Sequence, residues 1–397
     1  MLMLTSKRLF DLPRHQLKNH PNSKMFVTKT DGEWKGVSTA QFLKEVMSIS
    51  KGLISLGIQP GDNVGIVSNT RYEWNVMDIA IQQVGAIVVP FYPNISENDY
   101  RYIFNDARIK LCVVADQDLY QKITNIKADI PSLNQLFTMD VVPNAPHWNE
   151  IKIAGKEVEA QAVRDRMENV NYEDLVTIIY TSGTTGNPKG VMLSHKNLLS
   201  NVEACIDPIP ADSNSRVLSF LPVCHVYERM LHYLYFYLGC SIHFAESMDT
   251  IGDNIREVKP HVFTAVPRLI EKVFDKIMAK GDDLTGIKRK LFDWSLALGD
   301  QYDTRGKSAW YKIQLGIANK LVFSKWREGL GGNVELIITG GAACQLRLLR
   351  VFNAAKIPIR EGYGPTENSP VITVNPKNDL RIGTVGPCIV GQEIKLE

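Results

Sequence analysis

The feature of the sequence that most restricts its fold is an alternation of amphipathic helix patterns with short apolar strand patterns, which begins near residue 37. Ser38 and Gln41 have the spacing of a helix capping box, apolar residues from Phe42 to Leu53 recur on one helical face, and Gly57 ends the pattern. Short apolar strands that are separated by helices favour parallel sheets buried on both faces. The sequence therefore predicts a large α/β protein with two similar subdomains.

The same alternation continues through most of the chain. Helices are expected at about 71–83, 97–107, 268–280 and 345–355, with a mainly helical stretch at 283–328. Strands are expected at NVGIVS, AIVVPF, KLCVVAD, LVTIIY, VLSFLP, CSIHF, HVFTAVP and VELIIT. Residues 116–172 are more polar and are interpreted as a surface excursion. The apolar segment MLHYLYFYLGCSIHFA, residues 230–245, is shorter than the roughly 18–20 residues of a spanning helix, so it predicts a buried helix followed by a strand.

Composition narrows the class of protein. The chain has 397 residues, of which 44% are hydrophobic, and its 45 Lys and Arg are nearly balanced by 43 Asp and Glu. A net charge of +2 without blocks of one sign gives no indication of nucleic acid binding. Six scattered cysteines form no metal or disulfide pattern, and the N-terminus does not resemble a signal peptide. We expect a cytoplasmic protein without a transmembrane segment.

The run TIIYTSGTTGNPKGVMLSH, residues 177–195, contains six small residues between an apolar strand and Lys189. Glycines allow the backbone to approach a ligand, and clustered N–H and hydroxyl groups suit phosphate oxygens. Loop residues of this kind are Thr181, Ser182, Gly183, Thr184, Thr185 and Gly186. Composition alone fits a solvated hairpin equally well, and the spacing required of a Walker loop is not met.

The string YTSGTTGNPKG closely resembles the phosphate loop of the adenylate-forming (AMP-binding) superfamily, which includes acyl-CoA synthetases and luciferases. Three further stretches resemble other motifs of this superfamily in the expected order. LPVCHVYE contains His225, which the resemblance places between the acyl and adenylate sites. TGGAAC follows an apolar strand, and the resemblance assigns its Gly340, Gly341 and Ala342 to the adenine pocket.

The fourth stretch, EGYGPTE, resembles a motif in which the tyrosine stacks on adenine, the threonine binds the α-phosphate and the glutamate holds Mg²⁺. These roles fall on Tyr363, Thr366 and Glu367, with Gly362 and Gly364 beside the nucleotide. Pro365 departs from the bulky apolar residue that is usual in the motif, so the flanking residues carry the resemblance.

The resemblance spans nearly the whole chain and implies the N-terminal domain of an acyl-CoA synthetase/luciferase-like fold. We expect a first α/β part at about 1–172, a second with the nucleotide motifs at about 173–375, and the start of a smaller β subdomain at about 376–397. The segment VGQEIKLE predicts a strand that runs to Glu397, and it favours a fragment of a longer protein whose C-terminal lid domain is absent.

The implied activity is ATP-dependent conversion of a long-chain fatty acid to acyl-AMP and then to acyl-CoA, with Mg²⁺ as the metal and CoA as cosubstrate. His225, Lys189, Thr184 and Glu367 are the expected catalytic residues, and the fragment is expected to turn over poorly. The alternatives are an acyl-AMP ligase that loads a carrier protein and a non-catalytic nucleotide-binding protein. Peripheral contact with the inner face of a membrane is compatible with the sequence, and no oligomeric state is predicted.

An alkyl chain would need an apolar tunnel or groove. Candidate lining residues are Tyr233, Tyr235, Phe236, Tyr237 and the strand Phe263–Pro267. Packing in the core explains most of these residues as well as an acyl site does.

Overall fold

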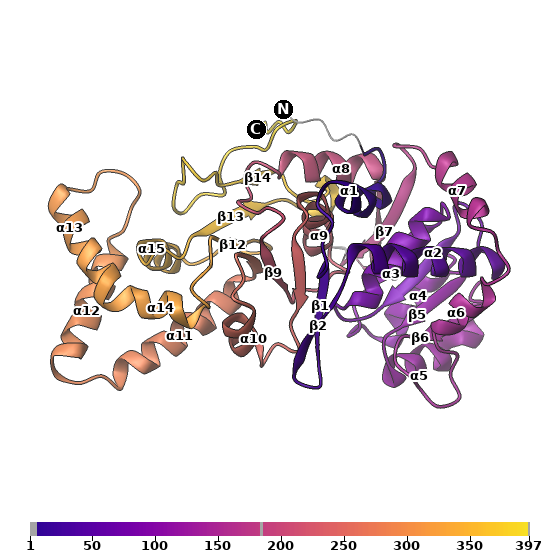
Figure 1. Cartoon of the computed structure of the whole chain (residues 1–397), viewed down its shortest axis with the longest axis horizontal. Coiled ribbons are helices and arrows are strands. Elements are labelled where there is room, and N and C mark those ends of the chain that lie inside the picture. The colour runs from indigo at the N-terminus through magenta and orange to yellow at the C-terminus, as the bar shows by residue number, and fades with distance from the viewer. Residues whose placement is uncertain (1–5, 183–185, 396–397) are drawn as a thin grey trace. The chain divides into compact units, whose positions relative to one another are not determined.

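The computed structural model describes residues 6–182 and 186–395 (Figure 1). The chain forms two compact units and passes between them several times. Unit 1 contains the described residues of Met1–Glu203 together with Pro222–Gly239 and Pro365–Pro370. Unit 2 contains Ala204–Leu221, Cys240–Gly364 and the described residues of Val371–Glu397. Short stretches from distant parts of the sequence thus complete each unit.

Unit 1 is built on a sheet whose strands run in the order β6-β5-β3-β4-β7-β8. The strands are β3 (Asn63–Val67), β4 (Ile87–Phe91), β5 (Leu111–Val114), β6 (Gln135–Thr138), β7 (Leu175–Thr181) and β8 (Lys189–Ser194). All neighbouring pairs are parallel except β7 and β8, which are antiparallel. The predicted parallel α/β architecture is therefore confirmed.

Helices cover both faces of this sheet. On one face, α4 (Glu97–Asp106) and α5 (Gln117–Ile126) pack Phe104 and Ile123 against Val67, Phe91 and Val114 of the strands. On the other, α3 (Tyr72–Gln83) packs on β3 and β4 and is itself covered by α2 (Thr39–Ser55) and α7 (Ala160–Asn169). The expected capping box of α2 is present, because Ser38 and Gln41 exchange hydrogen bonds. Burial on both faces explains why the central strands β3, β4 and β5 are almost entirely apolar.

The interpretation of residues 116–172 as a surface excursion is wrong. This segment supplies α5, the edge strand β6, α6 (Asn149–Ala154) and α7. Leu119 and Ile123 are buried one helical turn apart, and Leu136 and Phe137 of β6 are also buried. The polar background concealed a narrow apolar face on a helix and a strand of four residues, which is short for recognition by pattern.

Unit 1 also contains a hairpin of β1 (Phe26–Thr30) and β2 (Glu33–Val37), and the helices α1 (Leu12–Asn19), α8 (His195–Ala204) and α9 (Val226–Leu238). Helix α9 ends at Gly239, whose φ of 81° is left-handed and suits glycine. Strand β10 (Ser241–Phe244) follows, so the helix and strand expected within 230–245 are both present.

Unit 2 has its strands in the order β14-β13-β12-β11-β9-β10. They are β9 (Arg216–Ser219), β10, β11 (Val262–Ala265), β12 (Leu336–Thr339), β13 (Ile359–Tyr363) and β14 (Thr373–Val374). The pairs are parallel except for β13 with β14. The helices are α10 (Ile251–Val258), α11 (Pro267–Asp282), α12 (Gly286–Asp300), α13 (Ala309–Ala318), α14 (Ser324–Gly329) and α15 (Leu346–Ala354), with a π-helical turn at Asn319–Phe323 between α13 and α14.

The strand expected at 390–397 is not formed by its described part, residues 390–395. Ile394 is 49% exposed there, so its alternation with charged neighbours does not reflect a buried face. Alternation needs a neighbouring strand and a core before it specifies a strand. Within the described ranges, none of the helices is long and apolar enough to span a bilayer.

His195 at the start of α8 holds the N-terminal segment of unit 1. Its Nδ1 accepts a hydrogen bond of 3.1 Å from the backbone N–H of Leu9, and its ring lies edge-on to Phe10 at 5.6 Å between centroids. Burial, assisted by the nearby Arg8 and Arg229 cations, lowers the pKa of His195 to about 3. The folded protein therefore keeps this imidazole neutral.

Because the unfolded chain binds a proton at His195 below pH 6.5 and the folded chain does not until about pH 3, this group lowers stability as the pH falls through that window. Between about pH 7 and pH 5.5, we expect the free energy of unfolding to fall by about 1 kcal/mol more in the unsubstituted chain than in His195→Asn, whose amide oxygen can still accept from Leu9. Urea denaturation at both pH values measures this difference. Equal pH dependence in the two proteins would contradict it.

Candidate functional site

The loop from Thr181 to Lys189 connects the antiparallel strands β7 and β8. Thr181 pairs with Lys189, and Tyr180 pairs with Gly190. The hairpin interpretation of this run is therefore confirmed for its two strands. A hairpin does not exclude phosphate binding, which stays a prediction.

The residues of this loop differ in exposure. Thr181 is half-buried at the end of β7, whereas Ser182, Gly186 and Lys189 are exposed. Gly186 has a φ of 127°, a conformation that L side chains rarely adopt, so glycine is required there. Gly183, Thr184 and Thr185 lie outside the described residues.

His225 is the N-cap of α9 and is exposed. Its Nδ1 accepts a hydrogen bond of 3.2 Å from the backbone N–H of Tyr227. Desolvation by the surrounding protein lowers the pKa of His225, and the Glu228 carboxylate opposes that shift. A neutral ring whose Nδ1 accepts must carry its proton on Nε2, so His225 can offer one N–H donor to a ligand.

One turn further along α9, Arg229 is fully buried and forms an ion pair with buried Asp78 of α3 at 2.5 Å. Its Nε donates to the Tyr233 hydroxyl at 2.9 Å and its Nη1 donates to Thr177 Oγ1 at 2.7 Å. Tyr233 and Gln82 both donate to the Asp78 carboxylate, at 2.6 and 3.0 Å. This Arg229 network therefore joins α9, which begins at His225, to α3 and to β7, which ends at Thr181.

The turn that carries Thr366 and Glu367 also belongs to unit 1. It is a 3-10 turn, Thr366–Asn368, in which Thr366 is buried and Glu367 is exposed. The turn packs against β8, the strand that begins at Lys189. The Asn201 side chain of α8 donates to the Asn368 carbonyl at 3.5 Å. Unit 1 thus brings together two stretches that are about 180 residues apart in the sequence and that the resemblance assigns to phosphate and metal binding.

Among the described residues, Glu367 is not part of a metal site made of protein ligands alone. Residues 6–182 and 186–395 contain no cluster of three or more His, Cys, Asp or Glu side chains suited to a metal ion. A cation on Glu367 would take its other oxygens from phosphates and water, which is the usual arrangement for Mg²⁺ in nucleotide sites. The exposed carboxylate is compatible with that arrangement.

In unit 2, the Gly340–Ala342 turn follows directly from β12. Gly340 is buried, while Gly341, with a φ of 78°, and Ala342 are exposed. The turn lies beside the end of β13, because Thr339 pairs in parallel with Glu361 and the Cys344 N–H donates to Glu361 Oε1 at 3.2 Å. Ligands of open α/β sheets commonly bind outside the carboxyl ends of such strands.

Tyr363 is the last residue of β13 and is 55% exposed. Its carbonyl accepts from the Ile372 N–H at 2.8 Å, which fixes the backbone at this point. Gly362 and Gly364 on either side are half-buried. The adenine-pocket candidates of unit 2 therefore lie at the carboxyl ends of the neighbouring strands β12 and β13.

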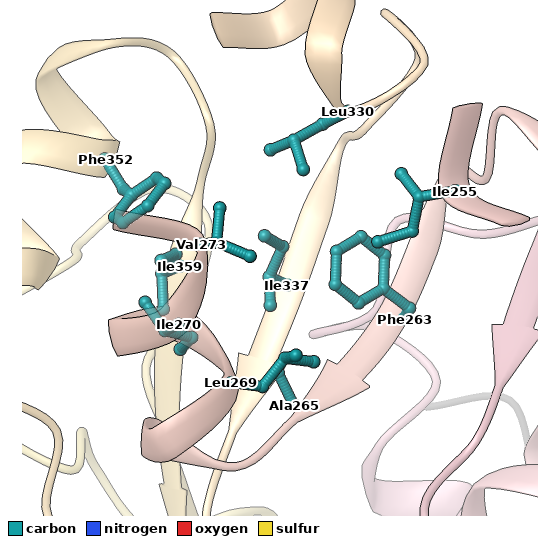
Figure 2. A pocket seen from close by; sticks show the side chains of 10 residues that line it. All are labelled: Ile255, Phe263, Ala265, Leu269, Ile270, Val273, Leu330, Ile337, Phe352 and Ile359. Atoms are coloured by element: carbon teal, nitrogen blue, oxygen red, sulfur yellow. The ribbon is translucent and has the colours of Figure 1, made fainter. Parts of the chain in front are cut away.

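Most of the aromatic residues considered for an acyl site are core residues in this structure, whereas Tyr237 is half-buried and its ring stacks on His15 at 4.6 Å between centroids. Tyr233, Tyr235 and Phe236 are each about 1% exposed. Phe263 and Ala265 face a small apolar cavity of unit 2, with a water-accessible volume of about 20 Å³, enclosed by residues such as Ile270, Ile337 and Phe352 (Figure 2). That volume holds about one water molecule and no alkyl chain.

Sequence patterns did not reveal Arg229, Asp78 or His195 as residues that position the motifs. Each is a polar residue in an apolar or mixed segment. Arg229 is 151 residues from its partner Asp78, and His195 is 186 residues from its partner Leu9. The available signal was a charged residue within the buried helix pattern of α9, since such residues are rarely buried unless paired.

Removal of either charge of the ion pair between Arg229 and Asp78 should destabilise the fold, because the other charge then stays buried without its partner. We expect Arg229→Met and Asp78→Asn each to lower the free energy of unfolding by about 3–5 kcal/mol, and the double variant to lose less than the sum. A double-mutant cycle by urea denaturation measures the coupling. Single losses that add within about 0.5 kcal/mol would show that the pair does not act as a unit.

Comparison with known proteins identifies the family of the chain. The family model described as AMP-binding enzyme matches residues 13–397. The chain is 30% identical over 388 residues to the long-chain-fatty-acid–CoA ligase FadD15 of Mycobacterium bovis, a match that covers 96% of this chain and 64% of the relative. The chain therefore spans less than two thirds of that relative's length.

Solved structures share the fold. A long-chain-fatty-acid-CoA ligase (FadD1) from Archaeoglobus fulgidus aligns with a TM-score of 0.74 at 18% identity, over 98% of this chain and 70% of that one. The anthranilate CoA ligase AuaEII, solved in complex with anthranoyl-AMP, aligns with a TM-score of 0.70 at 19% identity, over 98% and 65%. The motifs, the fold and the family match agree that this chain belongs to the AMP-binding enzyme family.

Proposed function

We propose that the chain is the nucleotide-binding part of a long-chain fatty acid CoA ligase. The enzyme would convert a fatty acid, ATP and CoA to acyl-CoA, AMP and pyrophosphate through acyl-AMP. The observation that supports this best is that unit 1 packs the turn bearing Thr366 and Glu367 against the strand that begins at Lys189. Similarity to ligases that act on long-chain fatty acids supports the substrate class.

In the first half-reaction, a carboxylate oxygen forms a bond to the α-phosphorus of ATP, and the bond from that phosphorus to the pyrophosphate oxygen breaks. Both reactants are anions, so the site must supply donors and cations where charge develops. We assign the pyrophosphate to the hydroxyl and N–H groups of Thr181–Gly186 and to the Lys189 ammonium, and the α-phosphate to Thr366. Lys189 is exposed at the start of β8, where its ammonium can reach a ligand.

Glu367 would hold Mg²⁺ through its exposed carboxylate. When bound, Mg²⁺ would neutralise charge on the phosphates. Nδ1 of His225 is already occupied by the Tyr227 N–H, so we assign its Nε2–H as a donor to the acyl carboxylate or the adenylate. Gly340, Gly341 and Ala342 would form a flat wall for adenine, and Tyr363, between Gly362 and Gly364, would stack on it.

In the second half-reaction, the CoA sulfur bonds to the acyl carbon, the bond from that carbon to the AMP oxygen breaks, and the proton of the thiol is released to solvent. We propose that a C-terminal lid, which would follow the β subdomain that starts near residue 376, takes part in this step. Without that lid, adenylation would be slow and thioester formation poor. We place the enzyme in the cytoplasm, a proposal supported by its six cysteines, all of them free thiols.

Pyrophosphate exchange tests the proposal and its alternatives. With carboxylic acids from acetate to C18, exchange of labelled pyrophosphate into ATP should be fastest with long chains. Lys189→Ala should lower the exchange rate by about 10²-fold or more, because a cation on the developing charge is lost. Lys196→Ala removes a nearby lysine of α8 that pairs with Glu173 on the surface, and its exchange rate should match that of the unsubstituted chain.

CoA-ester formation is measured alongside, also with the chain extended past Glu397. No exchange with any acid would favour a non-catalytic nucleotide-binding protein. Exchange with acyl transfer to a carrier protein but not to CoA would favour the acyl-AMP ligase. An unchanged rate in Lys189→Ala would remove Lys189 from the proposed site.

A further inference from the structure

Strand β7, which leads into the phosphate loop, contacts other elements of unit 1 on both faces of the sheet. Side chains alternate along a strand, so Thr177 and Tyr180 point to opposite faces. Thr177 accepts a hydrogen bond from Arg229 of α9. On the other face, the half-buried ring of Tyr180 packs against the apolar cluster that includes Phe91 of β4 and Phe104 of α4. The end of β7 is therefore held from two sides.

The Tyr180 hydroxyl has a specific partner beyond this apolar cluster. It donates a hydrogen bond of 2.5 Å to the carboxylate of Asp106, the last residue of α4. Burial, assisted by the hydrogen bond and charge of Asp106, raises the pKa of Tyr180, so the hydroxyl keeps the proton that it donates. The Tyr180 ring lies over Gly190, its partner on β8, where a Cβ would come 3.2 Å from Tyr180 Cζ and 2.7 Å from Ile178 Cγ2. Glycine at position 190 thus leaves the space that the ring occupies.

Asp106 is itself fixed by the end of α4. The carbonyl of the next residue, Ala107, accepts from the Asn63 side chain at 2.5 Å, and the Asn105 side chain donates to the Asp129 carbonyl at 3.0 Å. The helix dipole disfavours a carboxylate in the last turn of a helix, and α4 has no basic residue in that turn to offset it. The helix therefore gains nothing from this carboxylate, which favours a role through its hydrogen-bond partner on β7.

We propose that Asp106 is a positioning residue for the phosphate-loop hairpin, strands β7 and β8, and that it acts by accepting the Tyr180 hydroxyl. The inference rests on the proposed function, in which this hairpin holds the pyrophosphate of ATP. Thr181 follows Tyr180 directly and pairs with Lys189, so a displaced Tyr180 would move both groups that are assigned to phosphate. The hairpin needs an acceptor at position 106 and does not need its charge.

Pyrophosphate exchange, measured as a function of ATP and of palmitate concentration, tests this inference. Tyr180→Phe and Asp106→Ala should each raise the KM for ATP by about tenfold, which is the effect of one lost hydrogen bond, and leave the KM for palmitate unchanged. Asp106→Asn keeps an oxygen acceptor and should stay within about twofold of the unsubstituted chain. The double variant Tyr180→Phe/Asp106→Ala should be no worse than either single variant, because both remove the same bond.

Asp118→Ala is the matched control, since it removes an exposed carboxylate from the neighbouring helix α5 and should leave both KM values unchanged. A KM for ATP in Asp106→Ala that stays within twofold of the unsubstituted value would overturn the inference. Equal impairment of Asp106→Asn and Asp106→Ala would also overturn it, because the charge and not the acceptor would then matter.

Hydrogen–deuterium exchange separates this inference from the proposed function. In the nucleotide-free chain, peptides that cover residues 187–193 should exchange about tenfold faster in Asp106→Ala than in the unsubstituted chain or in Asp106→Asn, while peptides that cover β5 are unchanged. Circular dichroism melting establishes that each variant is folded. If even the unsubstituted chain exchanges no pyrophosphate, the proposed function fails, whereas the amide rates still decide whether Asp106 holds the hairpin. Equal amide rates in Asp106→Ala and the unsubstituted chain would contradict that role.

Discussion

The buried ion pair between Arg229 and Asp78 is the interaction on which the arrangement of unit 1 most depends. Burial of two charges costs several kcal/mol per ion unless each is paired and hydrogen-bonded, and here Tyr233, Thr177 and Gln82 supply the remaining bonds. The cost also makes the arrangement specific, because a helix shifted by one turn would leave both charges unpaired. The network thereby fixes α9, and with it His225, relative to the strand that ends at Thr181.

The candidate site residues lie on different kinds of backbone element. Half-buried Thr181 pairs with exposed Lys189 where the two strands of the hairpin meet the connecting loop. His225 sits at a helix N-cap with one ring nitrogen already committed to the backbone. In unit 2, the exposed turn after β12 and Tyr363 at the end of β13 are held by adjacent parallel strands. In each case a helix or strand holds the backbone of the candidate residue, a placement that suits a binding site.

Much of the fold follows from local patterns in the sequence. The capping box at Ser38, the apolar strands and the helix that ends at Gly239 are each specified by residues close in sequence, and all are present. The failures have a different cause. Helix α5 and strand β6 are held by contacts with distant strands, and the strand expected near Ile394 lacked a partner. Periodicity does not register whether a partner exists.

The candidate site, like the fold, could be predicted only in part from the sequence. Motif resemblance selected its residues, but only the structure shows that residues 365–370 return to unit 1 and pack on β8. The partners of Arg229 and His195 were equally invisible, because pairing across 150 or more residues leaves no local spacing.

We propose that a carboxylate oxygen attacks the α-phosphorus of ATP when both are bound to this chain. Single-turnover reaction of ATP with palmitate labelled by ¹⁸O in both carboxylate oxygens tests it directly, with the phosphorus products analysed by mass spectrometry after hydrolysis of the adenylate. The account predicts one ¹⁸O atom in AMP and none in pyrophosphate. Label in inorganic phosphate or in no phosphorus product would contradict it.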